Sequence, residues 1–136
     1  MDFGHPLNCL TFNLQRASRN LVRSFEEAAK DSGVTAPQFT TLSLIGGFGE
    51  LTVSQIAERM GTDRTTLTRN LAVMARKGWI VEAGAQDRRL SIWRLSPEGH
   101  ATLDAALPVW RRFQAGLVDR IGPDAAAALL TTLTRL

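Results

Sequence analysis

The chain has 136 residues, 44% of them apolar, which is enough for one folded domain with a core. Its single cysteine excludes an internal disulfide framework, and no apolar run is long enough to predict a membrane span. The N-terminus has no basic-then-apolar signal segment, so we expect a cytoplasmic protein. A net charge of +3 does not by itself indicate a class of partner.

The first predicted element is a long helix over residues 6–33, after a loose end at residues 1–5. Apolar side chains at helical spacing form a stripe from Leu7 to Ala28. Gly33 should end this helix, because glycine adopts the left-handed conformation that terminates many helices.

A capping box predicts where the second helix begins. Thr35 and Gln38 stand three residues apart, so each side chain can satisfy the backbone amide of the other. Pro37 suits a first helical turn, where its missing amide hydrogen costs little. We expect an apolar helix over residues 38–45. Three glycines then predict a flexible break: Gly46, Gly47 and Gly49.

The same capping signal recurs at Thr52 and Gln55 and predicts a third helix, apolar on one face, that ends near Met60. Gly61 suits a left-handed stop after it. Asp63 can cap the next helix, and its negative charge suits that helix's positive end. Two helices joined by a tight turn are the expected result.

The fourth helix should run from Arg64 to Lys77, with Leu67, Leu71 and Met74 on the face that meets the domain. Short or basic side chains occupy the opposite face, which leaves room for a nucleic-acid duplex. Threonine can contact a phosphate or a thymine methyl, and arginine can bind guanine or phosphate. The alternative is a solvated amphipathic helix whose charges only keep it soluble.

A β-hairpin is predicted next. Gly78 can end the helix, and residues 79–83 and 90–95 have the composition of strands. In the loop between them, Asp87 and Arg89 can pair and stiffen the tip, which leaves Arg88 projecting toward a minor groove or a phosphate. A charged tip that simply faces water is the alternative.

Positive charge concentrates in this central part of the chain. Residues 59–94 carry a net charge of +5, which leaves −2 for the remainder. A polyanionic partner requires such a distribution. The basic side chains are Arg59, Arg64, Arg69, Arg76, Lys77, Arg88, Arg89 and Arg94.

The central stretch resembles the MarR family of regulators. The resemblance lies in DRTTLTRNL at residues 63–71, KGWI at 77–80, and DRRLSIWRLSPEG at 87–99. It implies an obligate homodimer that binds double-stranded DNA through the fourth helix and the wing, under the control of a small ligand or an oxidant. The expected DNA-binding residues are Arg64, Thr65, Thr66, Thr68, Arg69, Arg76, Arg88 and Arg89.

Two helices should complete the chain. Ser96 and Pro97 predict the start of a helix that runs to residue 121, with a kink at Pro108, and a Leu-rich helix over residues 124–136 should follow. The last helix has little within one small domain to cover it, so it could pack against a partner subunit or inside its own subunit. The resemblance favours the partner.

The expected fold is mainly α with a small β-hairpin wing, a winged helix-turn-helix with dimerisation helices at both ends. One domain covers residues 1–136. Residues 6–33 and 97–136 form the dimerisation helices, and residues 35–95 form the DNA-binding lobe. The predicted function is a sequence-specific DNA-binding regulator, a repressor, acting on a pseudo-palindromic operator. The alternatives are a winged helix that contacts protein without DNA, and a cysteine-based redox sensor.

No enzymatic constellation and no cofactor motif is present. A zinc site of Cys9, His5 and a partner chain's His100 is conceivable, but these residues lack metal-ligand spacing, so no metal is predicted. Alignment with the family's peroxide sensors puts the usual sensing position at Thr11. Cys9 lies two residues earlier and would face nearly the opposite way, which favours a small buried thiol in a helix-packing surface.

A ligand pocket is expected between the dimerisation helices and the DNA-binding lobe. Phe12, Arg16 and Phe39 are its candidate lining, two aromatic walls with one cation for an anionic aromatic effector. Ordinary core packing explains the two phenylalanines equally well.

Overall fold

The computed structural model describes residues 1–84 and 90–136, which form helices around a small sheet. The elements in chain order are η1 (Pro6–Asn8), α1 (Leu10–Ala28), η2 (Lys30–Ser32), α2 (Ala36–Phe48), β1 (Leu51–Thr52), α3 (Val53–Met60), α4 (Arg64–Arg76), β2 (Ile80–Ala83), β3 (Ile92–Leu95), α5 (Pro97–Ile121) and α6 (Pro123–Leu133). None of the described helices is both long and apolar enough to cross a membrane.

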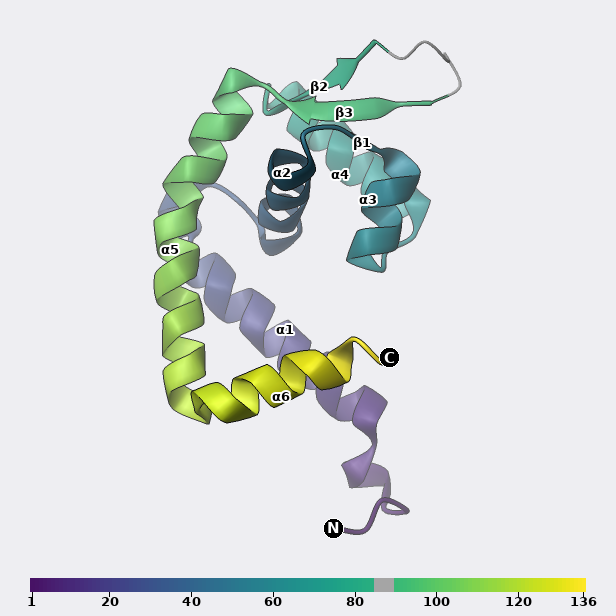
Figure 1. The fold of residues 1–136 in the computed structure, drawn as a ribbon, viewed down its shortest axis with the longest axis vertical. Helices are drawn as coiled ribbons and strands as arrows, with labels where there is room; N and C mark the ends of the chain where they lie inside the picture. Colours follow the sequence, from purple (N-terminus) through teal and green to yellow (C-terminus); the bar gives the residue numbers. More distant parts are fainter. Residues whose placement is uncertain (85–89) are drawn as a thin grey trace.

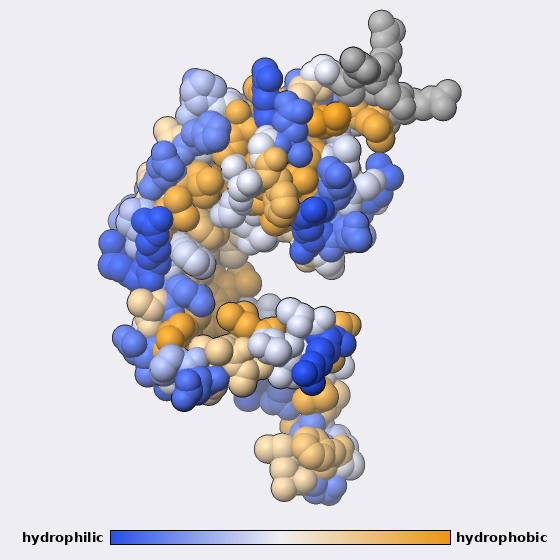
Figure 2. Space-filling view, in the orientation of Figure 1, coloured by the Kyte–Doolittle hydropathy of each residue, from blue (hydrophilic) through white to orange (hydrophobic). Residues whose placement is uncertain are grey.

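The molecule has two ends joined by α5 (Figure 1). Helices α2, α3 and α4 and the sheet form a lobe at one end, and α1 and α6 lie toward the other. Figure 2 shows an open concavity between α6 and the lobe. The winged helix-turn-helix with helices added at both ends, which the sequence predicts, is confirmed.

The sheet contains three strands among the described residues, in the order β1-β3-β2, and both pairings are antiparallel. Trp93 lies opposite Leu51 on one side and Glu82 on the other. The β2–β3 hairpin agrees with prediction, but β1 was missed. Two residues are too few to show the alternation that marks a strand in sequence.

Local capping chemistry sets the helix boundaries of the lobe. Both predicted capping boxes are present, with Gln38 N donating to Thr35 Oγ1 at 3.3 Å and Gln55 N donating to Thr52 Oγ1 at 3.2 Å. Gly61 follows α3 in the left-handed conformation, with φ of 63°. The turn between α3 and α4 therefore forms as expected.

The first helix differs from its prediction at both ends. Residues 6–8 form a separate 3-10 turn, and α1 begins only at Leu10, because the backbone of Cys9 is extended, with ψ of 121°. Asn13 Nδ2 donates to the carbonyl oxygens of Leu7 and Cys9 at this junction. At the other end α1 stops at Ala28, and a second 3-10 turn precedes Gly33.

The predicted break at Gly46 and Gly47 is also wrong, because both residues lie inside α2. A Cβ at position 46 would come within 3.0 Å of Leu103 Cδ2 and 3.2 Å of Leu95 Cδ1. The glycine therefore lets α2 pack closely on α5 and β3. Helix α5 itself continues through Pro108 and curves along its length (Figure 1).

The hydrophobic core lies in the lobe. Its largest fully buried apolar side chains come from α2, α3, α4 and β2: Leu42, Ile45, Ile56, Leu67, Leu71, Met74 and Ile80. No residue of α6 is buried within the chain. The core thus fixes the packing of the lobe, whereas α6 leaves apolar surface open to the solvent.

Ser96 joins the end of α4 to the start of α5. Its amide donates to Trp79 O at 3.0 Å, its hydroxyl donates to Gly78 O, and Gly99 N donates to Ser96 Oγ at 3.0 Å. A Cβ at Gly99 would overlap the Trp79 carbonyl and lie 2.8 Å from its carbon. The backbone just after α4 and the backbone at the start of α5 are therefore in direct contact.

Gly99→Ala should lower the free energy of unfolding by about 2 kcal/mol or more, because the added methyl meets backbone that cannot give way. Gly116→Ala in the same helix is the matched control. A Cβ there meets nothing within 4 Å, so alanine should stabilise by roughly 0.5–1 kcal/mol. Urea titrations at one protein concentration measure both, and equal stability of the two variants would contradict the packing described.

Candidate nucleic-acid interface

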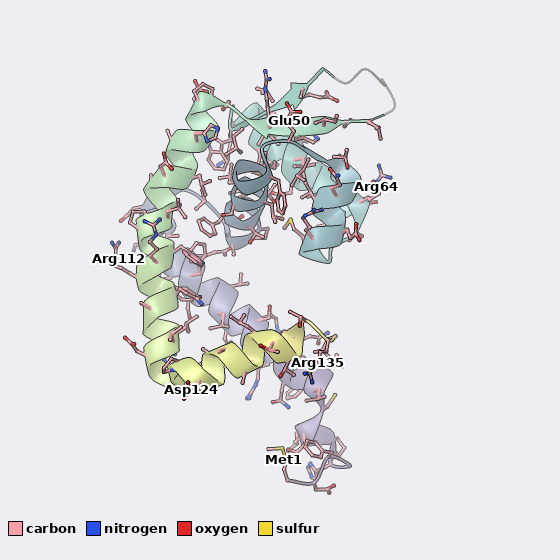
Figure 3. All side chains as sticks on the ribbon, viewed as in Figure 1. Met1, Glu50, Arg64, Arg112, Asp124 and Arg135 are labelled. Atoms are coloured by element: carbon pink, nitrogen blue, oxygen red, sulfur yellow. The ribbon has the colours of Figure 1, made fainter. Side chains whose placement is uncertain are left out.

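Helix α4 is anchored by one face and open on the other. Leu67, Leu71 and Met74 are 1%, 1% and 0% exposed, so the helix cannot rotate without disturbing the core. The residues of the opposite face that the sequence marks as DNA-binding are all exposed: Arg64, Thr65, Thr66, Thr68, Arg69 and Arg76. Figure 3 shows Arg64 extending from the surface of the lobe. The candidate residues of α4 therefore all lie on the solvent-exposed surface of one helix.

Asp63 fixes the N-terminus of α4. Its Oδ1 accepts from Thr66 N and its Oδ2 accepts from Thr66 Oγ1, both at 2.8 Å. These two hydrogen bonds hold the pKa of the Asp63 carboxyl below its usual value, and the bond from the Thr66 backbone amide has the larger effect. The Thr66 hydroxyl is therefore engaged in the cap, and its contact with DNA stays a prediction.

A groove of about 290 Å³ runs between α4, the start of α3 and β3. Arg64 and Thr68 line one side, and Ser54 and Ser91 are polar groups on the others. The sequence had predicted Arg64 and Thr68 but neither serine. The capping box at Thr52 could have indicated Ser54, since it places that residue in the first turn of α3, next to the helix N-terminus.

Two further basic side chains of the lobe are stacked on aromatic rings. Arg59 Cζ lies 4.5 Å from the centre of the Phe48 ring, and Lys77 Nζ lies 4.7 Å from that of Trp79. Such contacts hold the cation in place without neutralising it. The charge of these residues therefore adds to the potential of the lobe.

The predicted wing tip lies outside the described residues. Asp87, Arg88 and Arg89 fall in the segment 85–89, so the pairing of Asp87 with Arg89 and the groove contact of Arg88 stay predictions. The strands that flank this segment, β2 and β3, are paired as a hairpin should be, with Ala83 opposite Ile92.

Known proteins share both the sequence pattern and the fold of this chain. A sequence profile of the MarR family matches residues 32–90. The transcriptional regulator MosR of M. tuberculosis, solved in complex with DNA, is 36% identical with a TM-score of 0.81, over 91% of this chain and 92% of that one. The chain belongs to the MarR family.

Two further relatives agree with this family. The transcriptional repressor CouR, solved bound to a 23-mer DNA duplex, is 26% identical with a TM-score of 0.86, over 99% of this chain and 96% of that one. An uncharacterised helix-turn-helix regulator of Bacillus cereus is 30% identical over 95 residues, 70% of this chain. The match spans 63% of that regulator's length. These relatives are transcriptional regulators, which as a class are generally not enzymes.

The candidate effector residues of this MarR-family chain fall into two places. Phe12 is 46% exposed on α1, with Arg16 Cζ 6.0 Å from its ring centre. Phe39 is 7% exposed in α2, with ring centres of Phe25 and Trp110 at 5.4 Å and 6.0 Å. Neither described cavity that Phe39 lines includes Phe12 or Arg16. Within one chain, the three residues do not form a common wall.

The prediction that Cys9 is a buried thiol in a packing surface is wrong for the described chain. Cys9 is exposed, because α1 begins one residue after it and leaves it at the N-cap, beyond the helix face that packs. Among the described residues no group of three His, Cys, Asp or Glu side chains could hold a metal ion.

Asp63→Ala should destabilise the protein at pH 7 and much less in acid. The folded pKa lies below the unfolded value of about 3.9, so the carboxylate stabilises the fold above that value and its contribution is lost as the pH falls through the folded pKa. Urea titrations of the wild type and the alanine variant should therefore converge below about pH 4. Asp63→Asn is the control, since asparagine caps without titrating. An undiminished gap between wild type and alanine variant at pH 3 would rule out the charged cap.

Proposed function

We propose that this chain is a sequence-specific DNA-binding transcriptional regulator, a repressor, that acts as a homodimer on a pseudo-palindromic operator. The observation that carries the proposal is the division of α4 into a fully buried face and a wholly exposed face of threonine and arginine. A helix held this way presents its outer side chains to a major groove in a fixed orientation.

The chemistry of the exposed face suits a duplex. Arg64, Thr65, Thr68 and Arg69 occupy the N-terminal half of α4, the half that enters the groove in a helix-turn-helix. Arginine can bind guanine through two hydrogen bonds, and threonine hydroxyls can donate to phosphates. The DNA complexes of MosR and CouR support the same partner for this chain.

The homodimer is proposed from the apolar surface that one chain leaves open. Figure 2 shows such surface on α6. Exposed leucines are spaced along this helix and past its end: Leu129, Leu130, Leu133 and Leu136. The N-terminal segment adds a second exposed apolar set: Met1, Phe3, Leu7, Leu10 and Phe12. Mutual burial of these two sets around a two-fold axis would remove both from water. To read half-sites one duplex turn apart, such a dimer would need its α4 helices about 34 Å apart.

A small molecule would act on this dimer by changing the distance between its two lobes. In one state of the dimer the spacing of the α4 helices matches the groove repeat, and in the other it does not. A ligand that binds the second state more tightly lowers the affinity for the operator, by at most the ratio of its own affinities for the two states. Because Ser96 hydrogen-bonds the segment after α4 to the first turn of α5, a movement of α5 in the dimer would also move α4.

Arg69→Ala should weaken binding to a selected operator by about 1–3 kcal/mol and leave non-specific binding nearly unchanged, because the side chain is proposed to read a base. Arg88→Ala, at the predicted wing tip, should weaken binding to all sequences more evenly. Mobility shifts at two salt concentrations measure both effects. Arg112→Ala is the matched control, since Arg112 lies on α5 away from α4 (Figure 3).

Wild-type protein should lose affinity steeply as salt rises, since binding releases counterions from the phosphates. A winged helix that contacts protein alone predicts no shift at either salt concentration. Operator affinity that is unchanged in both arginine variants would refute the assignment of these residues.

Leu130→Glu should shift the protein from dimer to monomer, because it places a charge in the proposed α6 interface. Thr131→Glu, about 160° from Leu129 and Leu133 on the same helix, should leave the dimer intact. Sedimentation of both variants at micromolar concentration measures the effect, with circular dichroism to check the helical content. A Leu130→Glu variant as dimeric as the wild type would remove α6 from the interface.

A further inference from the structure

The middle of the exposed face of α4 carries short side chains. Thr65, Thr68 and Ala72 are all exposed, and they stand at the spacing i, i+3 and i+7. Seven residues turn a helix through about 700°, so Thr65 and Ala72 lie within about 20° of one line, and Thr68 is about 40° from Ala72. These three residues therefore form one row along the helix, which we call the short row.

Basic side chains border the short row on both sides. Around the helix axis, Arg69 and Arg76 stand about 60° and 40° from Ala72 in one direction, and Arg64 stands about 80° away in the other. All three arginines are exposed. Long cations at the borders can reach phosphates or guanine edges, while the short side chains between them let base pairs approach the helix closely.

Ala72 limits which base edge can face it. Its side chain is a single methyl group, which is exposed and borders the groove of about 290 Å³ beside α4. A methyl group cannot replace the water that a polar base edge loses on contact, so such an edge costs free energy there. The apolar group that a base presents in the major groove is the 5-methyl of thymine. An A·T pair is therefore the pair that Ala72 favours.

The two threonines of the short row can pack in the same way. Each carries a methyl group beside its hydroxyl, and threonine methyls also contact thymine in the major groove. The row extends over about 10 Å from Thr65 to Ala72, at 1.5 Å per residue. That length matches three steps of about 3.4 Å between base pairs, so the three methyl groups can face different pairs of one half-site.

We propose that the short row reads the 5-methyl groups of thymines, and that Ala72 sets a preference for an A·T pair within each operator half-site. Thr65 and Thr68 contact thymine methyls at neighbouring pairs. The inference rests on the proposed function, because it names the base edges that the same recognition helix selects.

Exchange of thymine for uracil tests the methyl contact, because uracil differs from thymine only in lacking the 5-methyl group. A bound fragment is first selected from random DNA, and each thymine of one half-site is then replaced singly by uracil. Mobility shifts should show at least one thymine whose replacement weakens wild-type binding by about 4-fold, the effect of returning one buried methyl group to water. Unchanged affinity at every replaced thymine, or a selected half-site without any A·T pair, would overturn the proposal.

Ala72→Gly assigns one of these thymines to its residue. Glycine removes the protein methyl group, so this variant should bind the thymine and uracil fragments equally at that position. A general loss from a less stable helix affects both fragments alike and cancels in their ratio. Ala75→Gly is the matched control, because it has the same cost in helix stability but Ala75 packs against the core. Its ratio should equal that of the wild type.

Thr65→Ser keeps the hydroxyl and removes only the methyl group, so it should abolish the uracil effect at a different thymine. Thymine-to-uracil ratios that stay at the wild-type value at every position in Ala72→Gly would overturn the role of Ala72.

Cytosine methylation separates a methyl contact from an effect of DNA shape. At the thymine that couples to Ala72, the T·A pair is replaced by a C·G pair with or without a 5-methyl group on the cytosine. Wild-type protein should bind the methylated fragment about 4-fold more tightly, and Ala72→Gly should bind both equally. Equal binding of both by the wild type would overturn the proposal, because the uracil effect would then come from duplex deformability.

The proposed function and this inference fail on different results. The absence of a shift with any fragment would refute DNA binding, and the inference with it. A shift that is specific for one sequence but independent of every 5-methyl group would leave the proposed function standing and refute the inference alone.

Discussion

The hydroxyl of Ser96 is the interaction on which the rest of the arrangement depends. It donates to the carbonyl oxygen of Gly78, two residues after the end of α4, and accepts from the amide of Gly99 in the first turn of α5. The side chain at position 99 must be a hydrogen atom for these backbones to approach so closely. One residue thus caps α5 and fixes the direction in which α4 presents its outer face. A shift of the first turn of α5 therefore also moves the segment that follows α4.

Apolar burial divides the chain into a lobe that contains the hydrophobic core and a set of end helices whose apolar side chains stay largely exposed. The buried core belongs to α2, α3, α4 and the sheet, together with single residues of α1 and α5. The end helices leave large apolar side chains in water, and the lobe leaves arginines in water. Each exposed set suits a different partner. The first suits a second copy of the chain, and the second suits the phosphates of a duplex.

The capping boxes, the Asp63 cap and the inner face of α4 were predictable from sequence because each depends on residues three or four apart. The Gly46 packing was not, since the side chains that require a small residue there are Leu95 and Leu103, about fifty residues further along the chain. A pocket between the end helices and the lobe was expected, but of its predicted lining only Phe39 borders the cavity between α2 and α5. Phe39 had been chosen, but its partner across the cavity, Trp110, lies on a helix whose register against α2 no local pattern reveals. The exposure of the outer face of α4 was predictable because that face lies on a single helix.

The most direct test of the central claim, that the exposed face of α4 meets DNA in a symmetric pair, is hydroxyl-radical footprinting on a fragment selected from random DNA. The account predicts two protected segments related by two-fold symmetry, with centres about 10 base pairs apart on one side of the duplex. Continuous protection without that repeat, or no protection at low salt, would contradict it.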